Sequence, residues 1–211
     1  MLVASVSLWT RVTHWVNVLV WRAPLSVRLK SRLSALVYRN PPMPAERVVE
    51  TLAALRSAGV EAWVIGGWGI DALAGTQSRT HRDLDLIVDH PEIELALAVL
   101  LELGYVEWHR HLRPEQIGDL EAAGDNVVVR DEKMRVVDVH DVAVRSSGQQ
   151  FASGTIEGFR VNCFTAKQQL RAHQGYRKRL PHEQLRSRNN VQLARQLAKR
   201  NNPDAGADEH P

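Results

Sequence analysis

One stretch, residues 62–89, constrains the fold of this chain more than any other part of the sequence. Its apolar residues 63–65 predict a buried strand that ends at the pair Gly66-Gly67, and residues 68–74 can begin a helix directly afterwards. A glycine pair lets the backbone approach a ligand closely, and the free N–H groups of a helix start favour an anion such as phosphate. The stretch therefore predicts a strand, glycine turn and helix unit that can hold an anionic ligand.

Two carboxylates follow in the same stretch. Asp83 and Asp85 alternate with leucines in the sequence DLDL, so in a strand both carboxylates point to one face and both leucines point to the core. Neighbouring carboxylates repel each other, and such a pair usually persists because a divalent cation lies between them. Mg²⁺ prefers one or two carboxylates together with the phosphates of a substrate. The pair therefore predicts a metal site beside the glycine turn.

A second strand candidate, residues 135–144, carries another acidic side chain. In its sequence MRVVDVHDV, Asp138 and His140 share one face and valines occupy the other. An aspartate on an otherwise apolar strand is costly unless it is paired, hydrogen-bonded or bound to a metal. Asp138 can therefore complete a triad with Asp83 and Asp85. The alternatives are a surface aspartate on an edge strand and, for His140, a hydrogen-bonded structural histidine.

Length and composition favour one main domain in a reducing compartment. With 211 residues, of which 44% are apolar, the chain can bury one core and a small second lobe. The single Cys163 excludes an internal disulfide and a cysteine-cluster metal site. No stretch approaches 18 uninterrupted apolar residues, and residues 1–7 lack the basic start of a signal peptide. We therefore expect a cytoplasmic protein without a transmembrane segment.

Charge is distributed unevenly behind a net value of +3. Residues 1–40 hold six basic and no acidic side chains, residues 41–170 hold 12 basic and 20 acidic ones, and residues 171–200 hold nine basic and one acidic. An acidic middle between basic ends suits metal and polyphosphate chemistry, because carboxylates hold the cation and basic side chains meet an anionic substrate. The alternative is that the basic stretches are solvated helix faces.

The order of the predicted elements indicates an α+β fold. We expect a basic helical N-terminal extension over 1–43, a core over 44–164, a C-terminal helical part over 165–200 and a disordered tail over 201–211. Thr165 to Gln168 has the form of a capping box and predicts a helix start. The core should contain helices from Ala45 and Pro91, a strand at 105–108, and hairpins over 127–144 and 155–164.

These residues together resemble a known enzyme family. The sequence GGWGIDALAGTQSRTHRDLDL, residues 66–86, resembles the signature of the lincosamide nucleotidyltransferases and aminoglycoside 2''-adenylyltransferases, in the polymerase-β-like superfamily. The resemblance continues at VDVH (137–140), at GTIEGFRVNC (154–163) and more loosely at AHQGY (172–176), so that it covers roughly residues 45–176. It implies a polymerase-β-like nucleotidyltransferase core, a mixed β-sheet flanked by helices.

The resemblance also implies an activity. Asp83 and Asp85 match the carboxylates that bind catalytic Mg²⁺, and Asp138 matches a third carboxylate that serves as metal ligand or general base. The implied reaction is in-line attack of an acceptor hydroxyl on the α-phosphate of a nucleoside triphosphate, with ATP the expected donor, pyrophosphate leaving and two Mg²⁺ ions assisting. The implied partners are therefore the nucleoside triphosphate and a hydroxylated small molecule.

The nucleotide-binding residues are likewise implied by the resemblance. Gly66 and Gly67 match the loop that holds the triphosphate, and Arg79 and His81 occupy the motif positions near the phosphates. Trp68, next to the glycine pair, is a further candidate for contact with the nucleotide, and its alternative role is to pack the loop.

The C-terminal helical part departs from the drug-modifying relatives. Residues 171–200 are strongly basic and would repel a polycationic aminoglycoside. We therefore expect a less charged acceptor, such as another antibiotic. Two alternatives remain open: transfer to an RNA end, as in toxin-like nucleotidyltransferases, and a non-catalytic module whose basic ends bind nucleic acid.

Overall fold

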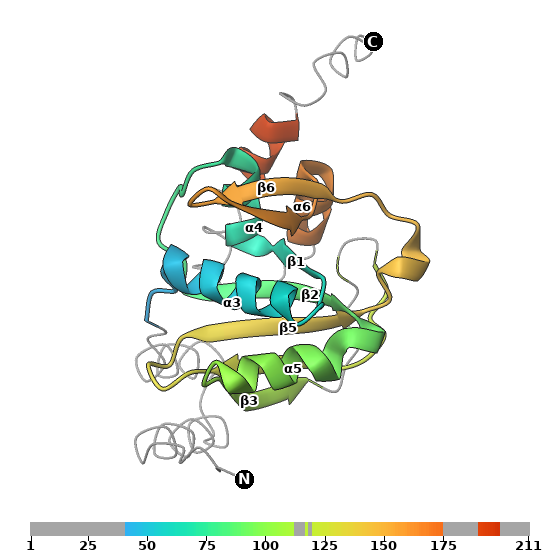
Figure 1. Ribbon diagram of the computed structural model, residues 1–211. Coiled ribbons are helices and arrows are strands. Elements are labelled where there is room, and N and C mark those ends of the chain that lie inside the picture. Colours follow the sequence, from blue (N-terminus) through green and yellow to red (C-terminus); the bar gives the residue numbers. More distant parts are fainter. Residues whose placement is uncertain (1–40, 112–116, 118–119, 175–189, 199–211) are drawn as a thin grey trace, which may run out of the picture.

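A computed structural model of the protein describes residues 41–111, 117, 120–174 and 190–198. Seven strands within these ranges form one sheet in the order β3-β4-β5-β2-β1-β7-β6 (Figure 1). The strands are β1 (Ala62–Ile65), β2 (Asp83–Asp89), β3 (Val106–His111), β4 (Asn126–Arg130), β5 (Val136–Val142), β6 (Ala152–Ile156) and β7 (Phe159–Cys163). The pairs β2/β5 and β1/β7 are parallel and the other pairs are antiparallel, which confirms the predicted mixed sheet.

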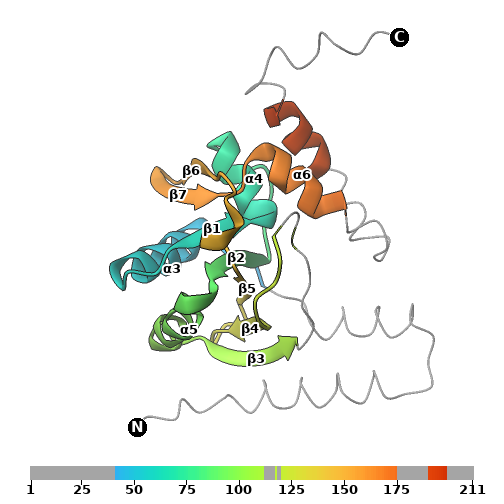
Figure 2. The same cartoon turned by 90° about the vertical axis from the view of Figure 1, so that its right-hand side faces the viewer.

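Helices flank this sheet. They are α3 (Ala45–Ser57), α4 (Gly66–Ala74), α5 (Ile93–Glu102) and α6 (Ala166–Gln174), with short 3₁₀ turns at His90–Glu92 and Arg145–Ser147 and a further helical segment over 190–198. Helices α3 and α5 lie on one side of the sheet and α6 on the other (Figure 2). No helix among the described residues is long and apolar enough to cross a membrane.

Alternation along β2 separates two apolar clusters, one on each face of the sheet. Leu84 and Leu86 are fully buried in the cluster that includes α3 and α5. Ile87 is also fully buried, but it joins the cluster on the opposite face, around Trp63. Because side chains alternate along a strand, Asp83 and Asp85 share the face of Ile87 and point away from α3 and α5. The predicted separation of carboxylates and leucines is confirmed.

Other local predictions are also confirmed. The two predicted hairpins are present as β4-β5 and β6-β7. The capping box forms as expected, because Gln168 Oε1 accepts a hydrogen bond from Thr165 N at 2.8 Å and Thr165 Oγ1 accepts one from Gln168 N at 3.2 Å. Residues 1–40 of the predicted extension and the predicted tail over 201–211 lie outside the described residues.

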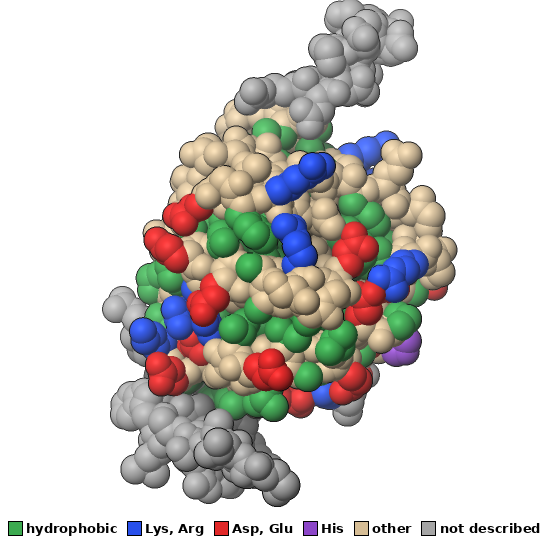
Figure 3. Space-filling model, viewed as in Figure 1, with side chains coloured by type: hydrophobic (Ala, Val, Ile, Leu, Met, Phe, Trp, Pro, Cys, Tyr) green, Lys and Arg blue, Asp and Glu red, His purple; other side chains and the backbone are tan. Residues whose placement is uncertain are grey.

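The outer surface over α3 and α5 intersperses acidic, basic and apolar side chains (Figure 3). Within α5, Leu100 is fully buried against the sheet, whereas the side chain of its neighbour Leu101 is 58% exposed. Substitutions at these adjacent leucines therefore test the buried and the exposed face of α5 separately.

Leu100→Ala should lower the free energy of unfolding by about 2–5 kcal/mol, because it removes buried surface and leaves a cavity. Leu101→Ala, its matched control, should change that free energy by less than about 0.5 kcal/mol. Urea denaturation followed by circular dichroism measures both values. Similar losses in the two variants would contradict the packing of α5 on the sheet.

Candidate active site

Two carboxylates lie side by side on neighbouring parallel strands. Strands β2 and β5 pair so that Asp85 stands opposite Asp138. Side chains at paired positions of adjacent strands point to the same face, and the strands are about 4.8 Å apart. Both residues are partly exposed, whereas the valines on either side of Asp138 are fully buried on the other face. The sheet therefore brings Asp138 to Asp85 from a separate part of the sequence.

His140 joins these two carboxylates. Asp85, Asp138 and His140 each offer a ligand atom, and these atoms lie within 4.8 Å of one another. His140 Nε2 is 3.8 Å from Asp138 Oδ1, too far for a hydrogen bond. Two ligands of one divalent cation, with bonds of roughly 2.0–2.2 Å, can be at most about 4.4 Å apart. The 3.8 Å separation of His140 Nε2 and Asp138 Oδ1 falls within this limit, so these two side chains can share a cation.

The surroundings of Asp138 support the same conclusion. Its Oδ1 atom is buried and has no hydrogen-bond partner within the described residues. A buried carboxylate oxygen without a donor is unfavourable unless a cation or another group compensates its charge. The two carboxylates therefore fit a divalent cation such as Mg²⁺ or Mn²⁺, and His140 adds a nitrogen ligand of the kind that transition metals accept more readily than Mg²⁺.

Asp83 lies on the same face of β2 as Asp85, at the first, exposed position of the strand. In the described part of the chain it is not a member of the group formed by Asp85, Asp138 and His140. A cation bound between β2 and β5 would lie one side-chain repeat away from Asp83 along the strand. Its role as a metal ligand therefore stays a prediction.

The glycine pair lies within the first turn of α4 and not in a turn before it, which differs from the expected boundary. The preceding Ile65 is extended, and Gly66 has a left-handed φ of +65°. A Cβ atom at position 66 would lie 2.1 Å from Asp85 Oδ2. Position 66 therefore requires glycine for two reasons: the backbone angle is left-handed, and the carboxylate leaves no room for a Cβ atom.

Arg79 and His81 lie next to the second glycine. A Cβ atom at Gly67 would lie 2.3 Å from His81 Nδ1 and 2.7 Å from Arg79 Nη2. The glycine pair therefore has Asp85 beside its first member and Arg79 beside its second. The first-turn N–H groups of α4, which have no intrahelical acceptor, and a guanidinium group thus lie on the glycine pair that contacts Asp85, which suits an anion bridged to a cation.

The rings of Trp68 and His81 are buried beneath this turn. Trp68 is 2% exposed and His81 is 1% exposed, and their ring centroids are 4.6 Å apart. This burial favours the packing role for Trp68. Direct contact of either ring with a nucleotide stays a prediction.

Sequence reasoning missed Asp71. This α4 residue is only 3% exposed, and its carboxylate accepts hydrogen bonds from Ser78 N (3.0 Å) and Ser78 Oγ (2.6 Å). The same carboxylate lies 2.5 Å from His81 Nε2. The available signal was an aspartate inside the otherwise apolar helix GGWGIDALA, because a buried acid needs partners.

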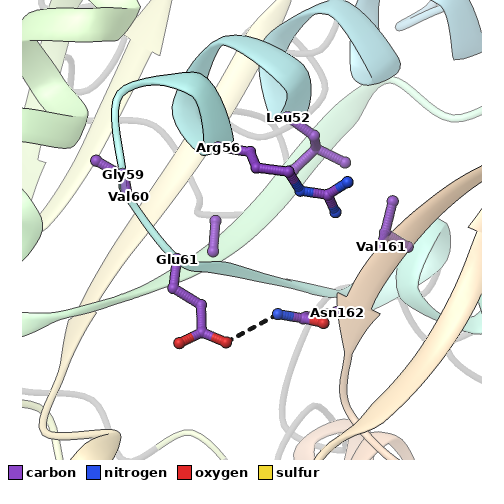
Figure 4. Close-up of a pocket in the computed structure, with 8 residues that line it drawn as sticks. Leu52, Arg56, Gly59, Val60, Glu61, Val161 and Asn162 are labelled. Carbon is purple, nitrogen blue, oxygen red and sulfur yellow. Dashed lines mark hydrogen bonds between the residues drawn. The ribbon is translucent and has the colours of Figure 1, made fainter.

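A separate pocket of about 280 Å³ lies at the other end of β1 (Figure 4). It is lined by Leu52, Arg56, Gly59, Val60, Glu61, Ala62, Val161 and Asn162. Within it, Asn162 Nδ2 donates to Glu61 Oε1 at 2.9 Å, and Arg56 donates to the carbonyl oxygen of Arg160 at 2.5 Å. Because Ala62 pairs with Val88 whereas Ile65 pairs with Asp85, this pocket lies away from the carboxylates.

Comparison with known proteins gives a family match. The sequence model of the aminoglycoside-2''-adenylyltransferase family matches residues 47–187. A lincosamide resistance protein from Staphylococcus haemolyticus is 24% identical over 130 residues, which cover 54% of this chain and 74% of that protein.

Solved structures show the same fold. The lincosamide antibiotic adenylyltransferase LnuA, bound to lincomycin, superposes with a TM-score of 0.54 at 17% identity, covering 74% of this chain and 99% of that one. The solution structure of ANT(2'')-Ia gives 0.56 at 19% identity, covering 73% and 83%. ANT(2'')-Ia in complex with adenylyl-2''-tobramycin gives 0.50 at 18% identity, covering 74% and 98%. These likenesses confirm the predicted nucleotidyltransferase core.

Gly66→Ala should disturb cation binding, because its Cβ atom would displace the Asp85 carboxylate. Gly75→Ala is a matched control: Gly75 also has a left-handed φ, +69°, but a Cβ atom there would meet only Thr155 Oγ1 at 3.7 Å. Both variants should lose about 1–2 kcal/mol of stability from the left-handed backbone.

Titration of Mn²⁺ followed by electron paramagnetic resonance measures cation binding in these variants. Only Gly66→Ala should weaken it, by about tenfold or more, which corresponds to about 1.4 kcal/mol. Equal Mn²⁺ affinity in the two glycine variants would contradict the close contact between Gly66 and Asp85.

Proposed function

Because the chain belongs to the aminoglycoside-2''-adenylyltransferase family, we propose that it transfers the adenylyl group of ATP to a hydroxyl group of a small antibiotic, with Mg²⁺ as cofactor and pyrophosphate as leaving group. Membership of the family makes the protein a nucleotidyltransferase. The observation that carries the proposal is the in-register pairing of Asp85 with Asp138 beside the glycine turn at the start of α4.

The carboxylates hold the divalent cations. Asp85 and Asp138 would provide the shared ligands, Asp83 would contribute from the start of β2, and His140 lies close enough to add an imidazole nitrogen. When bound, Mg²⁺ would lower the pKa of the attacking hydroxyl group and neutralise negative charge on the departing phosphates. The buried Oδ1 of Asp138, which has no hydrogen-bond partner in the described part of the chain, supports a role in holding positive charge.

The start of α4 holds the triphosphate. The backbone N–H groups of Gly66 and Gly67 belong to the first turn of the helix, where they have no intrahelical acceptor. These groups and the partial positive charge of the helix start attract phosphate, and Arg79 adds a guanidinium group beside Gly67. Since Gly66 has no side chain, the Asp85 carboxylate can lie directly against the helix start.

We also propose that Asp138 accepts a proton. In the transfer, the acceptor oxygen forms a bond to the α-phosphorus, the bond from that phosphorus to the bridging oxygen breaks, and pyrophosphate carries away the electron pair. The hydroxyl proton passes to a carboxylate or to water. We assign this role to the Asp138 carboxylate, since it has two oxygens and one of them can accept a proton while the other, Oδ1, holds the cation.

The acceptor is a less charged antibiotic in this proposal. One relative is named for lincosamide resistance, another binds lincomycin, and a third was solved with adenylyl-2''-tobramycin. The nine basic and one acidic side chains of residues 171–200 favour a lincosamide-like acceptor over a polycationic aminoglycoside. We place the reaction in the cytoplasm, since the single Cys163 is free and buried. The alternatives of an RNA acceptor and of a nucleic-acid-binding module depend on basic end segments that lie mostly outside the described residues.

Asp138→Asn should reduce adenylyl transfer by about 10²-fold or more, the effect expected when a general base is removed, since the amide keeps the shape but neither holds the cation nor accepts the proton. The measurement is pyrophosphate release from ATP and Mg²⁺ with lincomycin or tobramycin as acceptor. Asp141→Asn is the control, because Asp141 lies three residues further along β5 on the opposite face and pairs with His90.

The control should keep its turnover even where its stability falls. The proposal fails if the wild-type protein binds no nucleotide and releases no pyrophosphate with either acceptor. Labelled nucleotide appearing in RNA, with none in the antibiotics, would point to the RNA acceptor.

A further inference from the structure

A buried carboxylate lies behind the proposed nucleotide-binding turn. Asp71 is on α4, five residues after the helix begins, and is 3% exposed. Both of its oxygens are in use: Oδ1 accepts from Ser78 Oγ at 2.6 Å, and Oδ2 accepts from Ser78 N at 3.0 Å and lies 2.5 Å from His81 Nε2. One side chain therefore fastens two points of the following loop to the helix.

The fastened loop, residues 75–82, connects α4 to β2 and carries Arg79. Residues 75–78 are exposed, and Arg79 is only partly buried. An exposed connection with few buried contacts opens easily unless specific bonds hold it. The contacts of Asp71 with Ser78 and His81 lie on either side of Arg79, so they limit where its guanidinium group can be.

His81 transmits this contact to the glycine turn. Its ring is 1% exposed and packs between Trp68, at 4.6 Å, and Gly67, where a Cβ atom would lie 2.3 Å from Nδ1. The carbonyl oxygen of His81 also accepts a hydrogen bond from Met43 N at 2.9 Å. The ring is thus wedged beneath the first turn of α4, with one nitrogen at Asp71 and the other at Gly67.

We propose that Asp71 is a positioning residue for the nucleotide site, which acts through His81 and Ser78 to hold the glycine turn and Arg79 in the arrangement that receives the triphosphate. It does not touch the nucleotide. Packing at this buried position of α4 does not require a carboxylate, since an apolar residue could fill the same space. We therefore infer that the carboxylate serves to fix one geometry of the loop. The nucleotide part of this inference rests on the proposed function.

Asp71→Asn tests the inference with two readouts. Replacing one carboxylate oxygen of Asp71 by an NH₂ group removes a hydrogen-bond acceptor for the loop. Amide hydrogen exchange in residues 75–82 should therefore become at least tenfold faster. The dissociation constant for ATP with Mg²⁺, measured by calorimetry, should rise at least tenfold. Exchange in β4 and β5 should stay as in the wild type, which separates a local effect from general loss of stability.

Asp89→Asn provides a matched control. Asp89 is equally buried, 3% exposed, and its Oδ1 accepts hydrogen bonds from Val144 N at 2.7 Å and Arg145 N at 3.1 Å. It lies at the far end of β2 from Asp83, so its loss should affect stability without changing exchange in residues 75–82 or the affinity for ATP.

His81→Phe tests whether Asp71 acts through the histidine. The phenyl ring keeps the packing against Trp68 and Gly67 but loses the nitrogen at Asp71. We expect its affinity for ATP to fall, and Asp71→Asn in the His81→Phe background to add less than threefold, because coupled residues are not additive.

Wild-type exchange in residues 75–82 of a folded Asp71→Asn protein would overturn the proposal. So would faster exchange there with unchanged affinity for ATP, or fully additive losses in the double variant. A wild-type protein that binds no nucleotide would contradict the proposed function instead, and the exchange result alone would then decide whether Asp71 holds the loop.

Discussion

The site depends on the parallel pairing of β2 with β5 in one register. This pairing sets Asp85 opposite Asp138, on the face of the sheet that α3 and α5 do not cover. Two carboxylates at this spacing repel each other, and burial of Asp138 Oδ1 strengthens the repulsion because the local dielectric constant is lower. A shift of one residue would turn one carboxylate into the core. The site therefore depends on this register, and positive charge near both groups would stabilise it.

Gly66, at the start of α4, also lies against the Asp85 carboxylate. Gly66 follows β1 directly and has a left-handed backbone conformation. Asp85 occupies the space that a side chain at position 66 would need. Helix α4 therefore begins in direct contact with Asp85, and its first-turn N–H groups, which have no intrahelical acceptor, lie beside one carboxylate of the proposed metal site. The proposed anion and cation sites would therefore share the contact between Gly66 and Asp85.

Much of this was predictable because it follows from local periodicity. Alternation in DLDL and VVDVHDV gave the correct faces for Asp85 and Asp138, and turn and capping residues gave both hairpins and the start of α6. The contact of Asp71 with His81 was not predictable in this way, since it depends on the path of an irregular loop. The approach of His140 to both carboxylates depends on strand register, which alternation alone does not set.

Helix α4 also connects the proposed nucleotide site to the C-terminal helical part. Its Ile70 is buried in a cluster with Ala166 of α6 and with Ala194 and Leu197 of the segment 190–198. Gly69 lets α6 approach closely, because a Cβ atom there would lie 2.2 Å from Gln169 Nε2. One short helix thus contacts Asp85 at its start, the loop over residues 75–82 through Asp71, and the C-terminal helices through Ile70. An acceptor held by the C-terminal helices would be positioned relative to the nucleotide by α4. Substitutions in the C-terminal helices could therefore change acceptor specificity without altering the proposed nucleotide site.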